Sequence, residues 1–161
     1  TVRDGGGITP DVTIEGHDYS RLTYSLVYSG IIQEYALDYV REHADADEDF
    51  HLADKDWDGF VAFAKTKEFD YRSSAKTYFD RMKKELEKDG LSKNMSAELD
   101  ALQKALEMDK ETFLKLKKDE IVPFIEEEIA VRYHFQEAGI KIRLRYDDQL
   151  KKALASPMIE I

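Results

Sequence analysis

The fold class of this chain is decided by residues 20–43, which read SRLTYSLVYSGIIQEYALDYVREH. Apolar and aromatic side chains recur there at the three- and four-residue spacing of one helix face, and they are Tyr24, Tyr28, Ile31, Ile32, Tyr35 and Tyr39. Ser20 suits the N-cap of such a helix, because its hydroxyl can accept a hydrogen bond from an amide of the first turn. The pattern therefore predicts one amphipathic helix over residues 20–43.

The same periodicity returns along most of the remaining chain, so the predicted fold is mainly all-α, with about six helices in an irregular bundle. The further helices are expected over residues 57–67, 74–89, 96–118, 119–138 and 148–155. Their expected N-caps are Asp56, Ser73 or Ser74, Ser96, Asp119, and Asp147 or Asp148, and Gly90 is the expected left-handed residue after the third helix. Residues 140–146, IKIRLRY, alternate strictly between apolar and polar side chains, which predicts a short strand or an extended surface segment.

Composition excludes several classes of partner. The chain has 161 residues, a formal net charge of −10 and no cysteine. Because phosphate contacts need a basic face, this charge argues against nucleic acid and against an anionic membrane surface as partners. Without cysteine there is neither a disulfide nor thiol catalysis, and no apolar run is long enough to span a bilayer. The sequence indicates no cofactor.

The chain begins differently, with TVRDGGGITPDVTI over residues 1–14. Three successive glycines favour a tight turn, and Pro10 favours an extended residue before it. The stretch therefore predicts a strand, a turn and a second strand. Two strands alone are marginally stable in water, so we expect them to be the last strands of a larger sheet. The expected division is residues 1–18 as the end of a preceding domain and 19–161 as a helical domain.

Residues 6–12, GGITPDV, carry a family resemblance. They resemble the Gly-Gly-Ile-x-Pro-Asp segment that closes the catalytic domain of C-terminal processing peptidases, also called tail-specific proteases. The remainder resembles the helical C-terminal extension of envelope members of that family, with landmarks at residues 60–63, 68–71, 127–133 and 147–153. The family's nucleophilic Ser and its Lys would both lie upstream of Thr1, so no residue of this chain inherits a catalytic role.

The resemblance implies a parent protein that is a serine-type endopeptidase of the periplasm or cell envelope. This chain would then be a non-catalytic region that supports the protease core, shapes substrate access or mediates assembly. The implied partners are the rest of the protease chain, its protein or peptide substrates, and a second copy in a homo-oligomer. The alternative function is a non-enzymatic helical domain for protein interaction.

Two short patterns suggest chemistry of their own. Residues 54–59, DKDWDG, match the opening of a calcium loop, but the twelfth position holds Lys65 instead of a bidentate Glu, so an acidic first helical turn is the favoured interpretation. Ser73 and Lys76 match the Ser-x-x-Lys spacing of penicillin-recognising enzymes. The Ser-Asp-Asn and Lys-Thr-Gly elements of those enzymes are absent from the sequence, so a helix cap is favoured for Ser73.

The remaining polar candidates give no metal or catalytic site. The four histidines show neither His-x-x-x-His nor Glu-x-x-His spacing on an expected helix, and they are His17, His43, His51 and His134. Glu126, Glu127 and Glu128 are expected on a solvated helix face, with Arg132 placed to pair with Glu128. The tyrosines of residues 20–43 are expected to be half-buried core, with a peptide-docking surface as the alternative.

Overall fold

The computed structural model describes residues 13, 16 and 18–155, and within them the chain forms eight α-helices, one 3₁₀ turn and no strand. The helices are α1 (Arg21–Tyr28), α2 (Ile31–Glu42), α3 (Asp54–Lys65), α4 (Ser74–Lys88), η1 (Ser92–Met95), α5 (Ser96–Leu106), α6 (Lys110–Leu116), α7 (Lys118–Arg145) and α8 (Asp148–Ala155). The predicted all-α class is confirmed. The predicted strands of the first fourteen residues lie, but for residue 13, outside the described part of the chain.

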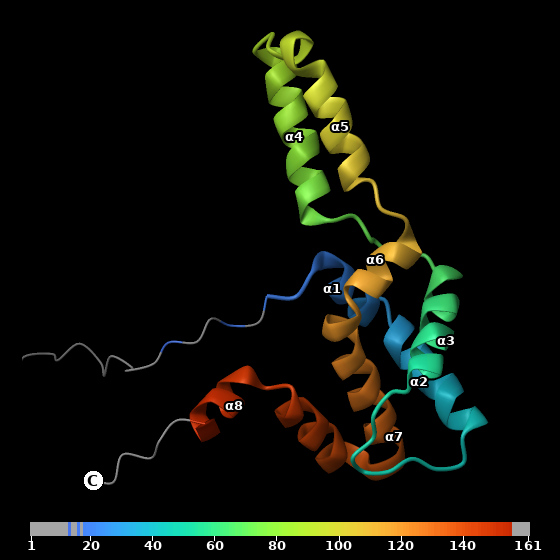
Figure 1. The fold of residues 1–161 in the computed structure, drawn as a ribbon. Coiled ribbons are helices and arrows are strands. Elements are labelled where there is room, and N and C mark those ends of the chain that lie inside the picture. The colour runs from blue at the N-terminus through green and yellow to red at the C-terminus, as the bar shows by residue number, and fades with distance from the viewer. Residues whose placement is uncertain (1–12, 14–15, 17, 156–161) are drawn as a thin grey trace, which may run out of the picture.

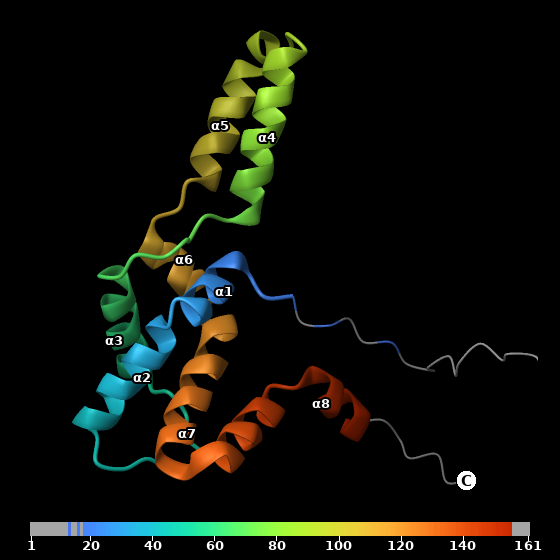
Figure 2. The ribbon, with the colours of Figure 1, turned by 180° about the vertical axis from the view of Figure 1, so that it is seen from behind.

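A body of five helices surrounds the main core (Figures 1 and 2). It consists of α1, α2, α3, α6 and the first half of α7, with α2 packed along α7. The most deeply buried side chains come from all five helices, and they include Leu22, Leu26, Ile32, Phe60, Leu114, Ile121, Ile125 and Ile129. The helical periodicity of the sequence therefore identifies part of this core, including Ile32, Phe60, Ile121, Ile125 and Ile129, but not Leu22 and Leu26 of α1.

Residues 20–43, which are expected to form one helix, form two. The helical conformation is interrupted at Ser29 and Gly30, between α1 and α2. Gly30 has a φ of 75°. A left-handed residue cannot continue a right-handed helix, and glycine adopts this conformation without a steric penalty. In the sequence the apolar spacing continues across the break, so periodicity alone does not reveal it, and α1 buries Leu22 and Leu26 in place of the predicted Tyr24 and Tyr28.

Helix α7 bends sharply between its two halves. His134 and Phe135 leave helical geometry, with Phe135 at φ 63° and ψ −169°. The predicted end before Gly139 and the predicted strand over residues 140–146 are therefore wrong, because the chain resumes a helix after the bend and runs to Arg145. The halves pack through a small second cluster made of Ala130, Ala138, Ile142 and Tyr146.

Helices α4 and α5 form an antiparallel hairpin that projects from the body, and we call residues 74–106 the arm (Figures 1 and 2). Ser73 caps α4, and Gly90 ends it at φ 73°, as predicted. Over the arm, all of which the structure describes, only Phe79 and Leu99 are buried. Its exposed large apolar side chains are Tyr78, Met82, Leu91, Met95 and Leu102.

Other helix boundaries correct the sequence-based expectations. α3 begins at Asp54, so Asp56 lies inside the helix and does not cap it. The expected helix over residues 96–118 ends at Leu106, and Asp109 caps the separate helix α6. α7 begins before Asp119, which is therefore not its N-cap. At the last helix, Asp147 accepts hydrogen bonds from the amides of Gln149 and Leu150, which confirms one of the two expected caps.

Candidate functional site at the base of the arm

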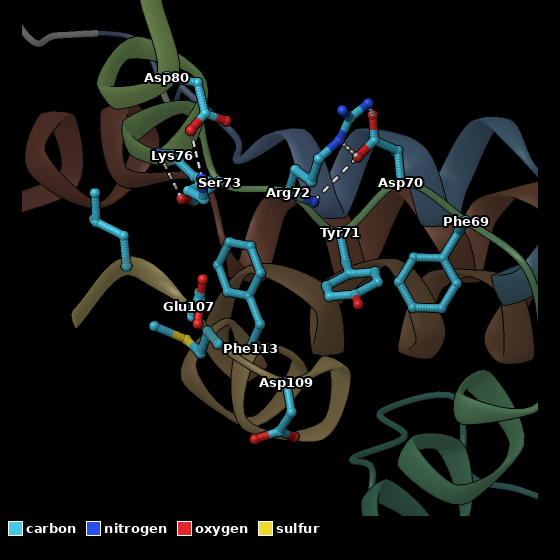
Figure 3. Close-up of a pocket in the computed structure, with 12 residues that line it drawn as sticks. Phe69, Asp70, Tyr71, Arg72, Ser73, Lys76, Asp80, Glu107, Asp109 and Phe113 are labelled. Atoms are coloured by element: carbon cyan, nitrogen blue, oxygen red, sulfur yellow. Dashed lines mark hydrogen bonds and ion pairs between the residues drawn. The ribbon is translucent and has the colours of Figure 1, made fainter. Parts of the chain in front are cut away.

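A cavity of about 800 Å³ lies where the arm joins the body, and we call it the arm-base groove (Figure 3). Two non-helical connectors run beside it, residues 66–73 before α4 and residues 107–109 after α5. The lining consists of Phe69, Asp70, Tyr71, Arg72, Ser73, Lys76, Asp80, Leu106, Glu107, Met108, Asp109 and Phe113. Both connectors, the first turns of the arm and α6 thus contribute to one site.

Aromatic and aliphatic side chains give the groove an apolar surface. Phe113 of α6 is buried, and the rings of Phe69 and Tyr71 lie edge to face with centroids 6.2 Å apart (Figure 3). The Lys110 ammonium lies over the Phe69 ring at 4.8 Å from its centroid, which adds a cation–π contact. Rings held in this way offer a rigid surface to an apolar ligand group.

The first connector is fixed to the body by polar contacts. The Asp70 amide donates to Ser25 Oγ of α1 at 2.9 Å, and the Asp70 carboxylate pairs with Arg21 at 2.7 Å. Lys110 Nζ donates to the Lys67 carbonyl at 2.7 Å. These contacts hold the Phe69 and Tyr71 backbone in place, so the groove is preformed.

Among the polar residues that line the groove, which we call its rim, carboxylates outnumber cations by four to two. The two cations are paired, Arg72 with Asp70 and Lys76 with Asp80 (Figure 3). Two further cations lie outside the lining, Arg21 paired with Asp70 and Lys110 over the Phe69 ring. Two more carboxylates, Glu107 and Asp109, belong to the second connector.

Hydrogen bonding keeps one of these carboxylates charged. The Thr112 hydroxyl and amide donate to the Asp109 carboxylate, and these bonds hold the pKa of Asp109 below its usual range. Asp109 therefore keeps its charge to a lower pH than an ordinary aspartate.

Ser73 and Lys76 lie in this rim with the geometry of a helix cap. Ser73 Oγ accepts a hydrogen bond from the Lys76 amide at 3.0 Å, while Lys76 Nζ pairs with Asp80 one turn further along α4 (Figure 3). A lysine that serves as a base must be neutral and directed at the nucleophile, whereas this ammonium is held by a carboxylate. The expectation that the chain contains no catalytic residue stays a prediction.

The calcium-like residues lie on helix α3, which starts at Asp54. Asp54 pairs with Lys118 of α7 at 2.7 Å, and Gly59 lies in the helix interior. An EF-hand loop instead needs its glycine at a sharp turn that wraps the ligands around one ion. Within the part of the chain that the structure describes, no three His, Asp or Glu side chains are grouped so as to hold a metal ion.

The expectation for the three glutamates of α7 is wrong for Glu126. Its side chain is 2% exposed and accepts hydrogen bonds from the Leu52 amide, the Tyr146 hydroxyl and Arg145. It therefore joins the two halves of α7 to the segment before α3. The pairing of Arg132 with Glu128, by contrast, is confirmed.

The tyrosines of α1 and α2 divide into two groups. Tyr35 and Tyr39 of α2 are half-buried and pack against the core, as expected. Tyr24 and Tyr28 of α1 are 44% and 83% exposed, and their rings are stacked with centroids 6.1 Å apart. The half-buried interpretation therefore holds for α2 and fails for α1.

One family model matches the chain over residues 22–156, and its description is "Probable PDZ-protease, C-terminal helical domain". The chain belongs to this family. Membership confirms the resemblance to the C-terminal portion of a processing protease. No curated protein and no solved structure matches the chain significantly. Among the described residues, no helix of this PDZ-protease domain combines the length and apolarity required to cross a membrane.

Proposed function

We propose that this chain is a non-catalytic helical region of a serine-type, C-terminal processing endopeptidase, and that it controls how substrate reaches the protease core. Family membership supports the link to a protease chain. The segment GGITPDV at residues 6–12 supports the narrower assignment to tail-specific proteases. The partners are then the remainder of the protease chain and its protein or peptide substrates. A location in the periplasm or cell envelope is part of the proposal and rests on the same resemblance.

The observation that carries the non-catalytic assignment is the ion pair between Lys76 and Asp80. Ser73 and Lys76 are the candidate nucleophile and base, because they have the Ser-x-x-Lys spacing. With Ser73 Oγ accepting from the Lys76 amide and the ammonium held by Asp80, neither group is activated for attack on a peptide carbonyl.

Substrate access is favoured among the three supporting roles because of where the arm-base groove lies. The groove has an aromatic lining and opens beside an arm that extends away from the body (Figures 1 and 3). Concave apolar sites with a few polar groups are the usual form of binding sites. Assembly through a second copy is the second candidate among these roles, and the exposed apolar side chains of the arm support it.

The test is peptide hydrolysis by the purified chain. Unstructured peptides should remain intact on incubation with the wild-type chain, and with Ser73→Ala and Lys76→Ala variants. Turnover by the wild-type chain that disappears in Ser73→Ala would contradict the proposal. Joining the chain to its parent protease, with and without the Tyr71→Ala change in the groove, should leave cleavage of a short ester unchanged and slow the cleavage of a protein substrate.

A further inference from the structure

We propose that the arm-base groove binds an extended peptide segment through a large apolar side chain flanked by basic residues. The inference rests on the proposed function in one respect, which is that the segment belongs to a substrate of the protease. The binding itself is a property of the residues around the groove and is measured without proteolysis.

The apolar anchor follows from the size and lining of the groove. Its volume of about 800 Å³ exceeds what one side chain fills and lies in the range typical of ligand sites, roughly 300–1,000 Å³. The rings of Phe69, Tyr71 and Phe113 and the side chains of Leu106 and Met108 line it together. A large aliphatic or aromatic side chain would bury its surface against these groups, with its peptide backbone lying along the groove.

The basic flanks follow from the charge of the rim. Arg72 and Lys76 are each engaged with a carboxylate, so a ligand carboxylate would have to compete with Asp70 or Asp80 for them. Glu107 and Asp109 add two further negative charges on the opposite connector. A peptide with lysine or arginine beside its apolar anchor complements this rim, whereas an acidic flank is repelled by it.

The polar contacts that fix the connectors favour a preformed site over one that closes on its ligand. Asp70 is joined to α1 by Ser25 and Arg21, and Asp109 is fixed by Thr112. Binding then requires little ordering of the protein, which is the costly part of association for flexible surfaces.

The experiment measures fluorescence anisotropy of two labelled peptides, GKLFLKG and GELFLEG, titrated with the intact chain. The lysine-flanked peptide should bind about fivefold or more tightly than the glutamate-flanked one at low salt, and the difference should shrink as salt is added. Tyr71→Ala should weaken binding of GKLFLKG about tenfold. Glu107→Lys should reduce the preference between the two peptides about fivefold or reverse it.

Two matched variants control for unspecific effects. Tyr78→Ala removes an exposed tyrosine of the arm that is not part of the groove lining, and Glu87→Lys reverses a charge near the far end of α4. Both should bind GKLFLKG like the wild type, with thermal unfolding confirming that all four variants are folded.

Equal affinity for the two peptides, no binding of either, or an equal effect of Tyr78→Ala and Tyr71→Ala would overturn the inference. Each of these results leaves the hydrolysis test of the proposed function unaffected. Conversely, selective peptide binding together with hydrolysis by the chain alone would contradict the non-catalytic assignment but support peptide binding in the arm-base groove.

Discussion

At the scale of single residues, Glu120 joins the beginnings of two helices that are far apart in sequence. Its carboxylate accepts hydrogen bonds from the Ser20 amide and the Thr23 hydroxyl of α1, at 2.9 and 3.0 Å. It also pairs with Lys117 at 2.6 Å, and its side chain is only 17% exposed. Burial acts to raise the pKa of Glu120, but the hydrogen bonds from Lys117 and from the first turn of α1 outweigh it and lower the pKa to about 2.

This depressed pKa predicts a defined pH dependence of stability. A carboxyl group with a lower pKa in the folded chain than in the unfolded one contributes fully above the unfolded value, near 4.5, and loses that contribution as pH falls towards about 2. Glu120→Gln should therefore reduce the free energy of unfolding by about 2 kcal/mol at neutral pH, and the gap to wild type should close between roughly pH 5 and pH 2. Urea unfolding of both proteins at several pH values measures this difference in the free energy of unfolding.

Glu85→Gln is the matched control for this prediction. Glu85 pairs with Lys88 at the surface of α4, where both side chains are about two thirds exposed, at 65% and 69%. Such pairs contribute little, roughly 0–1 kcal/mol. A gap for Glu120→Gln that does not vary with pH, or that matches the control, would mean that the contacts of Glu120 do not stabilise its charged form.

Glu126 shows which features of a single residue the sequence can predict and which it cannot. Glu126 lies four residues after Val122 and four before Ala130, so helix geometry places it on the apolar face, and its burial can be predicted from the sequence. Its partners Leu52, Arg145 and Tyr146 cannot, because only the tertiary fold brings them together. By contrast, the caps Ser73 and Asp147 are local, and each is one of the two residues that the sequence offered for its cap.

At the scale of elements, the bend in α7 allows its two halves to lie against each other. A Cβ atom added at Gly139 would lie 2.4 Å from Val131 Cγ2, so the second half approaches the first as closely as glycine permits. Arg143 and Glu127 form an ion pair between the same two halves. Phe135, at the bend, has a positive φ that bulky residues rarely adopt, and its side chain is 81% exposed.

The close approach predicts that Gly139→Ala is destabilising. Alanine normally favours a helix over glycine, but here its methyl group would collide with a β-branched side chain that has little rotamer freedom. We expect a loss of about 1–3 kcal/mol in the free energy of unfolding. Gly59→Ala in α3 is the matched change, because its Cβ would meet only Tyr35 Oη at 3.4 Å, and it should be neutral or stabilising by up to about 1 kcal/mol. Chemical denaturation compares the two, and an equal response would refute the argument from packing.

Helix periodicity predicted most elements but not their interruptions. The helices α1, α2, α4 and α7 follow from local spacing, although α1 buries Leu22 and Leu26 and not the predicted Tyr24 and Tyr28. The breaks at Gly30 and Phe135 each depend on a backbone conformation with positive φ, which the spacing of apolar residues does not report. The alternation over residues 140–146 does not report burial, because only Ile142 packs against the first half of α7, whereas Ile140 and Leu144 are exposed, at 53% and 46%. That arrangement resembles a strand in sequence and forms a helix in the structure.

At the scale of the whole molecule, the body and the arm differ in how much they bury. The body's core unites residues from Leu22 to Ile129, whereas the arm buries Phe79 and Leu99 within its described residues. The described core includes no residue before Leu22. The boundary expected near residue 18 is therefore compatible with this core, and it stays a prediction.

Deletion of residues 1–14 tests that boundary. The truncated chain should keep a cooperative thermal transition, with a midpoint within a few degrees of the full chain, because every side chain of the described core is retained. Circular dichroism and calorimetry measure the transition. Loss of cooperativity on deletion would show that the glycine-rich segment belongs to the helical domain and does not end a preceding one.

The arm-base groove lies between the arm and the body, so its shape depends on how the arm is oriented. One wall is the first turn of α4, and another is α6 of the body, so the width of the groove depends on the direction of the arm relative to the body. Helix α4 has 15 residues, which makes it about 22 Å long, so a shift of a few ångströms at its tip becomes a fraction of that at the groove. Coupling between two binding sites is reciprocal. If a partner bound at the tip of the arm changed the arm's direction, it would change the affinity of the groove for a peptide, and the peptide would change the partner's affinity by the same factor.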